Sequence, residues 1–163
     1  MTYRIAGLPR AAFTRFLAMD DAELAENGAR RVIADADHGY PCRISLEDAK
    51  RGESLVLLNH VSHDTANPFR TAYAIYVREH AVATGPGAEP WIDRLPPVFA
   101  GRTLSLRGFD EEGMLAGARL ASPDEIDARI RELFDMPRVA CIHAHNAAHG
   151  CFAARIERHG GGQ

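Results

Sequence analysis

Hydrophobic and polar positions alternate along several stretches of this chain, a pattern that predicts β-strands with one buried face. The strongest strand signal is Glu53–Asn59, which carries the apolar run SLVLL, and Thr71–Val77 repeats the alternation with Tyr73, Ile75 and Val77 on one face. The polar loop between these strands is longer than an ordinary hairpin turn, so we expect it to serve function. Weaker strand signals lie at Tyr3–Ala6, Arg31–Ala34, Pro41–Ile44, Thr103–Phe109 and Met114–Leu120.

The helical signal is strongest after Ser122. This residue is a typical N-cap, Pro123 suits the first helical position, and Glu125 completes a capping box. Pro137 is expected to end the helix. Its buried stripe is predicted to contain Ile126, Ile130, Leu133 and Phe134. Shorter helical segments are predicted after Pro9, Asp20 and Ser45.

Two strand-like runs close to the end of the chain, Val139–His145 and Cys151–Arg158, are separated by a short turn that suits a hairpin. If residue 145 lies opposite residue 151, one face of this hairpin is wholly apolar and belongs in the core, while Glu157 is solvated. His143, His145 and Cys151 then share the other face. The predicted apolar face contains Ala140, Ile142, Ala144, Phe152, Ala154 and Ile156.

Strands outnumber helices and come as hairpins, which favours an α+β fold with a curled, mostly antiparallel, barrel-like sheet and a few packed helices. The length of 163 residues is enough for one domain with its own core. We expect residues 1–159 to form a single α+β domain and residues 160–163 to be a flexible tail.

Composition and charge narrow the classes of function. The net charge of −3 argues against a nucleic-acid partner, which requires a clustered basic face. The sequence has neither a signal peptide pattern nor the ~20 apolar residues of a membrane helix, so no membrane partner is expected. The three cysteines form no CxxC pair, which favours free thiols in a reduced, cytoplasmic compartment. Nucleotide-binding and metalloprotease motifs are missing, and we expect no cofactor.

The histidine and cysteine face of the C-terminal hairpin is the most concentrated patch of chemistry in the sequence. An imidazole beside a thiol can produce a nucleophilic thiolate, which makes Cys151 with His145 as its base the candidate catalytic pair. Alternatively, His143 can join these two residues as zinc ligands, with a fourth ligand from His60, His63 or water. The structural alternative is a solvated strand face of mixed polar residues with a cysteine that packs as a small hydrophobe.

Other polar residues are candidates for ligand binding. The residues that we expect to contact a ligand are His143, Asn146, His63 and Arg70. Arginines beside predicted strands can bind an anion or serve as ordinary ion-pair partners, and these are Arg43, Arg70, Arg78 and Arg107.

The chain also contains four characteristic segments in order: GYPCRISLEDA-x-x-GE-x-LVLLN, AIYVRE, TLSLRGFD-x-x-GM and RVACIHAHNA-x-x-GCFAARIER. Together they resemble the bacterial family known as domain of unknown function 1203, from about Tyr3 to Arg158. The resemblance implies a bacterial, single-domain, soluble protein and brings no activity, cofactor or catalytic residue with it.

Three functions are consistent with these observations. The leading hypothesis is a small-molecule binding protein whose pocket is rimmed by His143, His145, Cys151 and the loop His60–Arg70. The second is an enzyme with Cys151 as nucleophile and His145 as base, and the third is a structural or partner-binding module. A lined cavity beside the hairpin favours the first two, whereas a flat solvated face favours the third.

Overall fold

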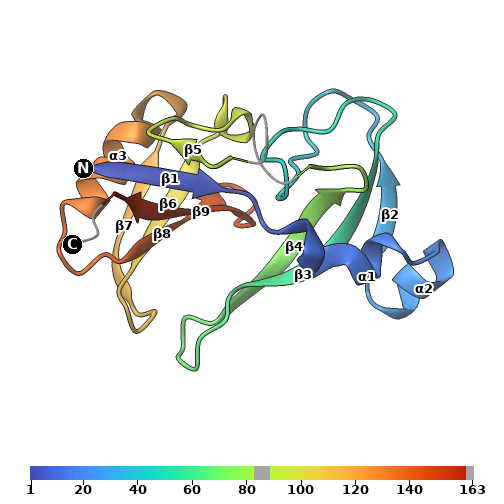
Figure 1. Ribbon diagram of the computed structural model, residues 1–163, viewed down its shortest axis with the longest axis horizontal. Coiled ribbons are helices and arrows are strands. Elements are labelled where there is room, and N and C mark those ends of the chain that lie inside the picture. The colour runs from blue at the N-terminus through green and yellow to red at the C-terminus, as the bar shows by residue number, and fades with distance from the viewer. Residues whose placement is uncertain (83–88, 161–163) are drawn as a thin grey trace.

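Two antiparallel β-sheets form the body of the computed structural model, which describes residues 1–82 and 89–160 (Figure 1). The strands are Thr2–Ala6 (β1), Arg30–Ile33 (β2), Ser54–His63 (β3), Thr71–Arg78 (β4), Trp91–Ile92 (β5), Leu104–Phe109 (β6), Leu115–Ala121 (β7), Cys141–Asn146 (β8) and Phe152–His159 (β9). The larger sheet has the order β5-β1-β9-β8-β6-β7, and the smaller has the order β2-β3-β4. The tail predicted from residue 160 onwards lies, at residues 161–163, outside the described residues.

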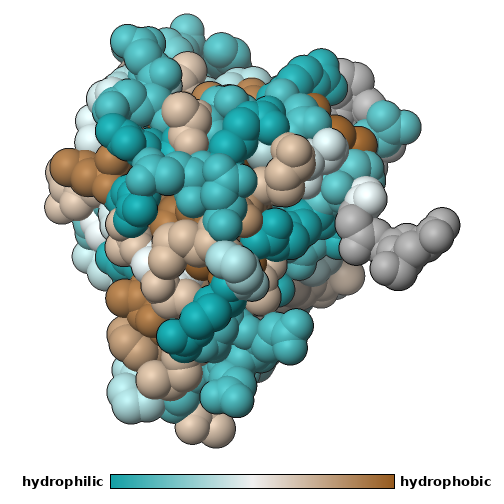
Figure 2. Space-filling view, turned by 90° about the vertical axis from the view of Figure 1, so that its left-hand side faces the viewer, coloured by the Kyte–Doolittle hydropathy of each residue, from teal (hydrophilic) through white to brown (hydrophobic). Residues whose placement is uncertain are grey.

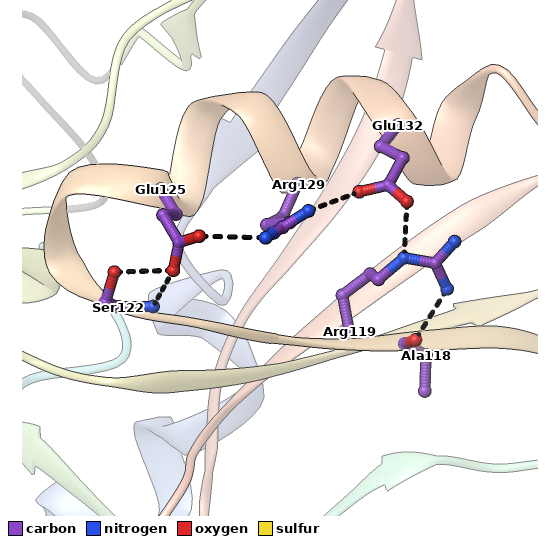
Figure 3. A network of polar contacts seen from close by, with 6 residues as sticks. All are labelled: Ala118, Arg119, Ser122, Glu125, Arg129 and Glu132. Carbon is purple, nitrogen blue, oxygen red and sulfur yellow. Dashed lines mark hydrogen bonds and ion pairs between the residues drawn. The ribbon is translucent and has the colours of Figure 1, made fainter.

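The larger sheet buries one face against helix α3, Ile126–Phe134 (Figure 1). The predicted stripe of this helix is confirmed, because all four of its apolar side chains are buried. A 3-10 turn at Pro123–Glu125 leads into α3, and Ser122 and Glu125 form the predicted capping box. Arg129 and Glu132 extend this network to Arg119 on β7, so that ion pairs tie the solvated side of α3 to the sheet (Figure 3).

The smaller sheet packs against two short helices near the N-terminus, α1 at Thr14–Leu17 and α2 at Asp21–Glu26 (Figure 1). The side chain of Asp20 caps α2, and Glu23 completes the capping box. The core on this side of the molecule contains Phe13, Leu24, Val56, Leu58, Ile75 and Val77. The protein therefore has an apolar cluster on each sheet.

The predicted α+β class and antiparallel pairing are confirmed, but the sheets do not close into a barrel. Each sheet keeps two edge strands, and the two are not hydrogen-bonded into one ring of strands. The strand predicted at Pro41–Ile44 and the helical turn predicted after Ser45 were wrong, since this segment is a buried loop held by isolated bridges. In addition, β3 continues to His63, which shortens the polar loop before β4.

The register of the C-terminal hairpin differs from the predicted one. Ile142 pairs with Ile156 and Ala144 with Ala154, a shift of two positions that leaves these residues on the core face as expected. A bulge between Ala144 and His145 then places Phe152 opposite His145. Phe152 is buried as predicted, but it lies on the histidine face rather than in the core beneath α3. The single extra residue in β9 turns its side chain to the other side of the sheet.

Within residues 1–82 and 89–160, no helix is both long and apolar enough to cross a membrane. The face drawn in Figure 2 is mainly hydrophilic, with hydrophobic residues in small groups between polar ones. The large hydrophobic side chains that remain exposed include Ile92, Leu115 and Leu120. Such scattered exposure is usual for a protein surface.

Candidate functional site

A cavity of about 590 Å³ lies beside the turn of the C-terminal hairpin. The smaller sheet provides a largely apolar wall with Leu57, Tyr73 and Tyr76, and the hairpin turn provides Asn146 and Cys151. This volume is within the range of pockets that hold metabolite-sized ligands, and an apolar wall with a few polar groups is their usual lining. A lined cavity, rather than a flat solvated face, therefore adjoins the hairpin.

Arg43 lies at this cavity on a loop that is itself buried from residue 41 to residue 46. Backbone hydrogen bonds fix the loop: Arg43 N–H donates to Tyr76 O at 3.0 Å, and Arg43 O accepts from Leu8 N–H at 2.7 Å. Leu46 has φ of +54°, a conformation that costs energy for any residue with a Cβ. Loops ordinarily lie at the surface. The burial of this loop is therefore unusual, and it places Arg43 inside the molecule.

The residue Arg43 is 2% exposed. Its Nε donates to Phe152 O at 2.7 Å, its Nη1 donates to Pro41 O, and its Nη2 donates to the Cys151 sulfur at 3.2 Å. Burial lowers the pKa of Arg43, and the neighbouring Cys151 and Cys42 sulfurs oppose this effect. Across the described residues, no Asp or Glu forms an ion pair with Arg43. The site thus contains a buried cation that lacks a carboxylate counter-ion.

Cys151 is half-buried and lines the same cavity. Its sulfur accepts a hydrogen bond from Asn146 Nδ2 at 3.1 Å in addition to the one from Arg43. The backbone also joins these residues, since Asn146 N–H donates to Cys151 O at 3.0 Å. Two of the residues expected at the site, Cys151 and Asn146, are therefore brought together.

A second arginine of the cavity, Arg102, differs from Arg43 in having a counter-ion. Its two terminal nitrogens donate to the two carboxylate oxygens of Asp48 at 2.9 and 2.7 Å. Such a forked pair balances the charge of Arg102 inside the protein. The uncompensated positive charge of the cavity is accordingly that of Arg43.

The histidines form a separate group between the two sheets. The ring centroid of His143 lies 5.0 Å from that of His63, 5.1 Å from Phe109 and 5.5 Å from Phe152. Burial, together with the nearby His63, Arg155, His145 and Arg107, lowers the pKa of His143 to about 3. Neither ring nitrogen of His143 has a hydrogen-bond partner among the described residues. This ring is neutral at physiological pH and serves as packing rather than as a base.

His145 lies opposite Phe152 rather than Cys151, and among the described residues no hydrogen bond joins His145 to Cys151. Its Nδ1 donates to Gly150 O at 2.9 Å, and its ring packs on Phe152 with centroids 5.9 Å apart. Burial lowers its pKa to about 4, against a smaller opposing effect of the Gly150 hydrogen bond. Because His145 is neutral near pH 7, it supplies no imidazolium to stabilise a Cys151 thiolate.

The loop residues proposed as ligand contacts also lie elsewhere. His63 is buried, stacks on Phe109 with centroids 4.0 Å apart and bonds Gly113 O through Nε2 at 2.9 Å. Arg70 is exposed and pairs with Asp64 at 2.9 Å. The described lining of the cavity includes Asn146 and Cys151 but neither of these residues, nor His143 or His145.

The described residues contain no assembled set of ligands for the zinc site considered as an alternative. In the part of the chain that the structure describes, no three His, Cys, Asp or Glu side chains are arranged to hold a metal ion. The sulfur of Cys151 is instead bonded to Arg43 and Asn146. All three cysteines are free thiols.

Sequence reasoning placed Arg43 among several arginines and did not single it out. The available signal was local, since a charged residue stands between Cys42 and Ile44 in a run that is otherwise apolar. A charged residue in such a run is either exposed at the surface or buried with polar partners. Only the three-dimensional arrangement shows that Arg43, Asn146 and Cys151 meet.

The fold and the cavity define an α+β protein with a cysteine-lined pocket beside two antiparallel sheets. The chain belongs to the family described as Protein of unknown function (DUF1203), whose model matches residues 39–158. This confirms the family expected from the four segments, and Arg43, Asn146 and Cys151 all lie within the matched region. No match was found among the curated proteins. None was found among the solved structures.

Proposed function

We propose that the protein binds a small molecule with an apolar body and an acidic head group in the cavity beside the C-terminal hairpin. The observation that carries this proposal is the uncompensated charge of Arg43, which is almost fully buried at the cavity and has no carboxylate partner among the described residues. Burying a cation without a counter-charge is costly, and an acidic ligand supplies that charge.

The hydrogen-bond inventory of the site supports an acceptor ligand. A guanidinium has five N–H groups, of which Arg43 uses three in the bonds described above, and the Asn146 amide uses one of two. The remaining donors match the acceptor oxygens of a carboxylate. Leu57, Tyr73 and Tyr76 supply the apolar wall for the rest of the molecule. We also propose that the protein is bacterial, as the family resemblance implies, and that it works in the cytoplasm, as its free cysteines favour.

Binding is tested with two probes of equal chain length, hexanoate and 1-hexanol, by the midpoint temperature of thermal unfolding. We expect hexanoate at tenfold its dissociation constant to stabilise the protein by about 1.4 kcal/mol, a rise in midpoint of roughly 3–5 °C. The uncharged alcohol should produce much less stabilisation, because it does not neutralise Arg43.

A matched pair of variants locates the binding site. Ala74 lines the cavity, and Ala72 is exposed on the same face of β4 two residues away but outside the lining. Ala74→Trp should fill the cavity and abolish the hexanoate effect, whereas Ala72→Trp should retain it. Equal stabilisation by the two probes, or equal effects of the two variants, would contradict the proposal and favour a structural or partner-binding module.

A further inference from the structure

The environment of Cys151 differs from that of the other two thiols. Cys42 is 0% exposed, and burial raises the pKa of Cys141, which is 7% exposed. Cys151 alone among the three is half-buried and lines the cavity, where its sulfur accepts N–H bonds from Arg43 and Asn146. Donors and a cation directed at a sulfur favour its thiolate over its thiol.

The burial of Arg43 beside Cys151 is a second observation that indicates a reactive sulfur. Arg43 is 2% exposed, and its Nη2 lies 3.2 Å from the Cys151 sulfur. The guanidinium of Arg43 therefore lies directly against the sulfur of Cys151. The thiolate is also the nucleophilic form of cysteine, and its exposure to the cavity gives small electrophiles access to it.

We propose that Cys151 is a modification site that reacts with hydroperoxides, with Arg43 and Asn146 as the groups that hold the thiolate and stabilise the leaving oxygen. The thiolate sulfur attacks the outer oxygen of R–O–O–H, so that an S–O bond forms and the O–O bond breaks. The R–O⁻ that leaves takes a proton from water. The products are Cys151 sulfenic acid and the alcohol R–OH, and two electrons pass from sulfur to the peroxide.

The remaining donors of the site suit this reaction. The negative charge moves from sulfur to the departing oxygen, and the N–H groups of Arg43 and Asn146 that are not used in the described bonds can donate to that oxygen. The wall of Leu57, Tyr73 and Tyr76 accommodates an organic hydroperoxide with an apolar body. The reaction uses the cavity of the proposed function but does not depend on the binding of an acidic ligand.

The test is to treat the reduced protein with cumene hydroperoxide and with hydrogen peroxide, trap sulfenic acid with dimedone, and map the modified cysteine by mass spectrometry. We expect Cys151 in the folded protein to react at least about tenfold faster than the same residue in urea-unfolded protein, and faster than Cys42 and Cys141. The unfolded chain is the reference because it contains the same thiol without Arg43 and Asn146 in place.

Variants of the residues around Cys151 test the roles proposed for Arg43 and Asn146. Asn146→Asp, nearly identical in shape, replaces the N–H donor with a negatively charged carboxylate beside the sulfur and should slow the reaction about tenfold or more. Arg43→Met should slow it as well, and the Asn146 variant keeps the test valid if loss of Arg43 prevents folding. Cys141→Ser should leave the rate unchanged.

Two outcomes overturn the proposal: reaction of folded Cys151 no faster than in urea, or an Asn146→Asp rate equal to wild type. The hexanoate measurement on the same samples separates the two proposals. Loss of hexanoate binding with rapid oxidation contradicts only the proposed function, and the reverse contradicts only the modification site.

Discussion

Arg43 and His143 are both almost completely buried, yet the protein treats them in opposite ways. Arg43 keeps its charge, because the guanidinium cannot lose its proton at ordinary pH and its donors meet two carbonyl oxygens and a sulfur. His143 gives up its charge, because burial lowers its pKa to about 3 and its ring lies among Phe109, Phe152 and His63. A permanent cation therefore marks the cavity, while a neutral ring fills the space between the sheets.

The neutral state of His143 makes the protein sensitive to acid. Its folded pKa of about 3 lies below the ordinary 6.5, so its contribution to stability is complete above pH 6.5 and is lost as the pH falls toward 3. Between pH 6.5 and 4.5, wild type should lose about 2 kcal/mol more free energy of unfolding than His143→Leu, which cannot titrate. Urea unfolding at several pH values checks this.

The same series includes its own control. At pH 7.5 the His143→Leu variant should be about as stable as wild type, because neither ring nitrogen of His143 has a hydrogen-bond partner in the part of the chain that the structure describes. Parallel pH curves for the two proteins would show that His143 is not held neutral by burial.

At the scale of elements, two hairpin tips hold the sheets together. His63, at the end of β3, bonds Gly113 O, and Asn67 donates to Glu112 O at 3.0 Å from the loop after β3. These contacts join the β3–β4 loop to the turn between β6 and β7, and the two tips point toward the same end of the molecule in Figure 1. The polar loop singled out in the sequence thus has a structural role, because it links the two sheets.

Substitution of Gly113, compared with substitution of Gly52, tests the contact between the two hairpin tips. Gly113 has φ of +75°, and a Cβ here would lie 2.6 Å from Thr65 Cγ2. Gly52 has φ of +87°, and a Cβ there would have no described atom beyond its chain neighbours within 4 Å. Gly52→Ala should cost about 1 kcal/mol from backbone strain alone. Gly113→Ala should cost about 1–2 kcal/mol more, because the tips must separate. Equal losses in urea unfolding would mean that the contact contributes nothing.

The strands and α3 could be predicted because alternation, caps and prolines are local signals. Alternation also sorted Ile142 and Ala144 onto the core face, but it cannot distinguish a shift of two residues, nor foresee the bulge that turns Phe152. Asn146 was recognised as a candidate because it stands in the turn of a clear hairpin. Cys151 was recognised because the predicted register placed it opposite His145, a pairing that the bulge replaces with Phe152. Arg43 was not singled out, because its significance depends on a missing counter-charge in three dimensions.

At the scale of the whole molecule, each sheet has its own apolar cluster, and aromatic and histidine rings lie between them. His60 of β3 approaches Phe13 at 5.6 Å and Phe152 at 6.4 Å between ring centroids. Arg43 adds a polar link, because its loop bonds to Tyr76 of β4 while its side chain bonds to Phe152 O of β9. The cavity is built where the two sheets are joined.

This arrangement predicts that residues 1–159 unfold as one domain. Neither sheet can separate without exposing Phe152 and leaving Arg43 without its hydrogen bonds. Urea unfolding should therefore give one transition, with coincident midpoints by far-ultraviolet circular dichroism and by fluorescence of Trp91, which packs on the α3 side. Two separated midpoints would identify the sheets as independent domains.

Both proposals place their chemistry at one buried guanidinium, because a bound acidic ligand would contact Arg43 beside the sulfur of Cys151. The most direct measurement is the rate of Cys151 alkylation by iodoacetamide at neutral pH as hexanoate is added, followed by mass spectrometry. Hexanoate should slow alkylation with the dissociation constant found from thermal unfolding, and 1-hexanol should have little effect, because only the acid binds Arg43 and blocks the sulfur. An alkylation rate that stays constant while hexanoate still stabilises the protein would contradict the account, because the ligand would then bind away from Arg43 and Cys151.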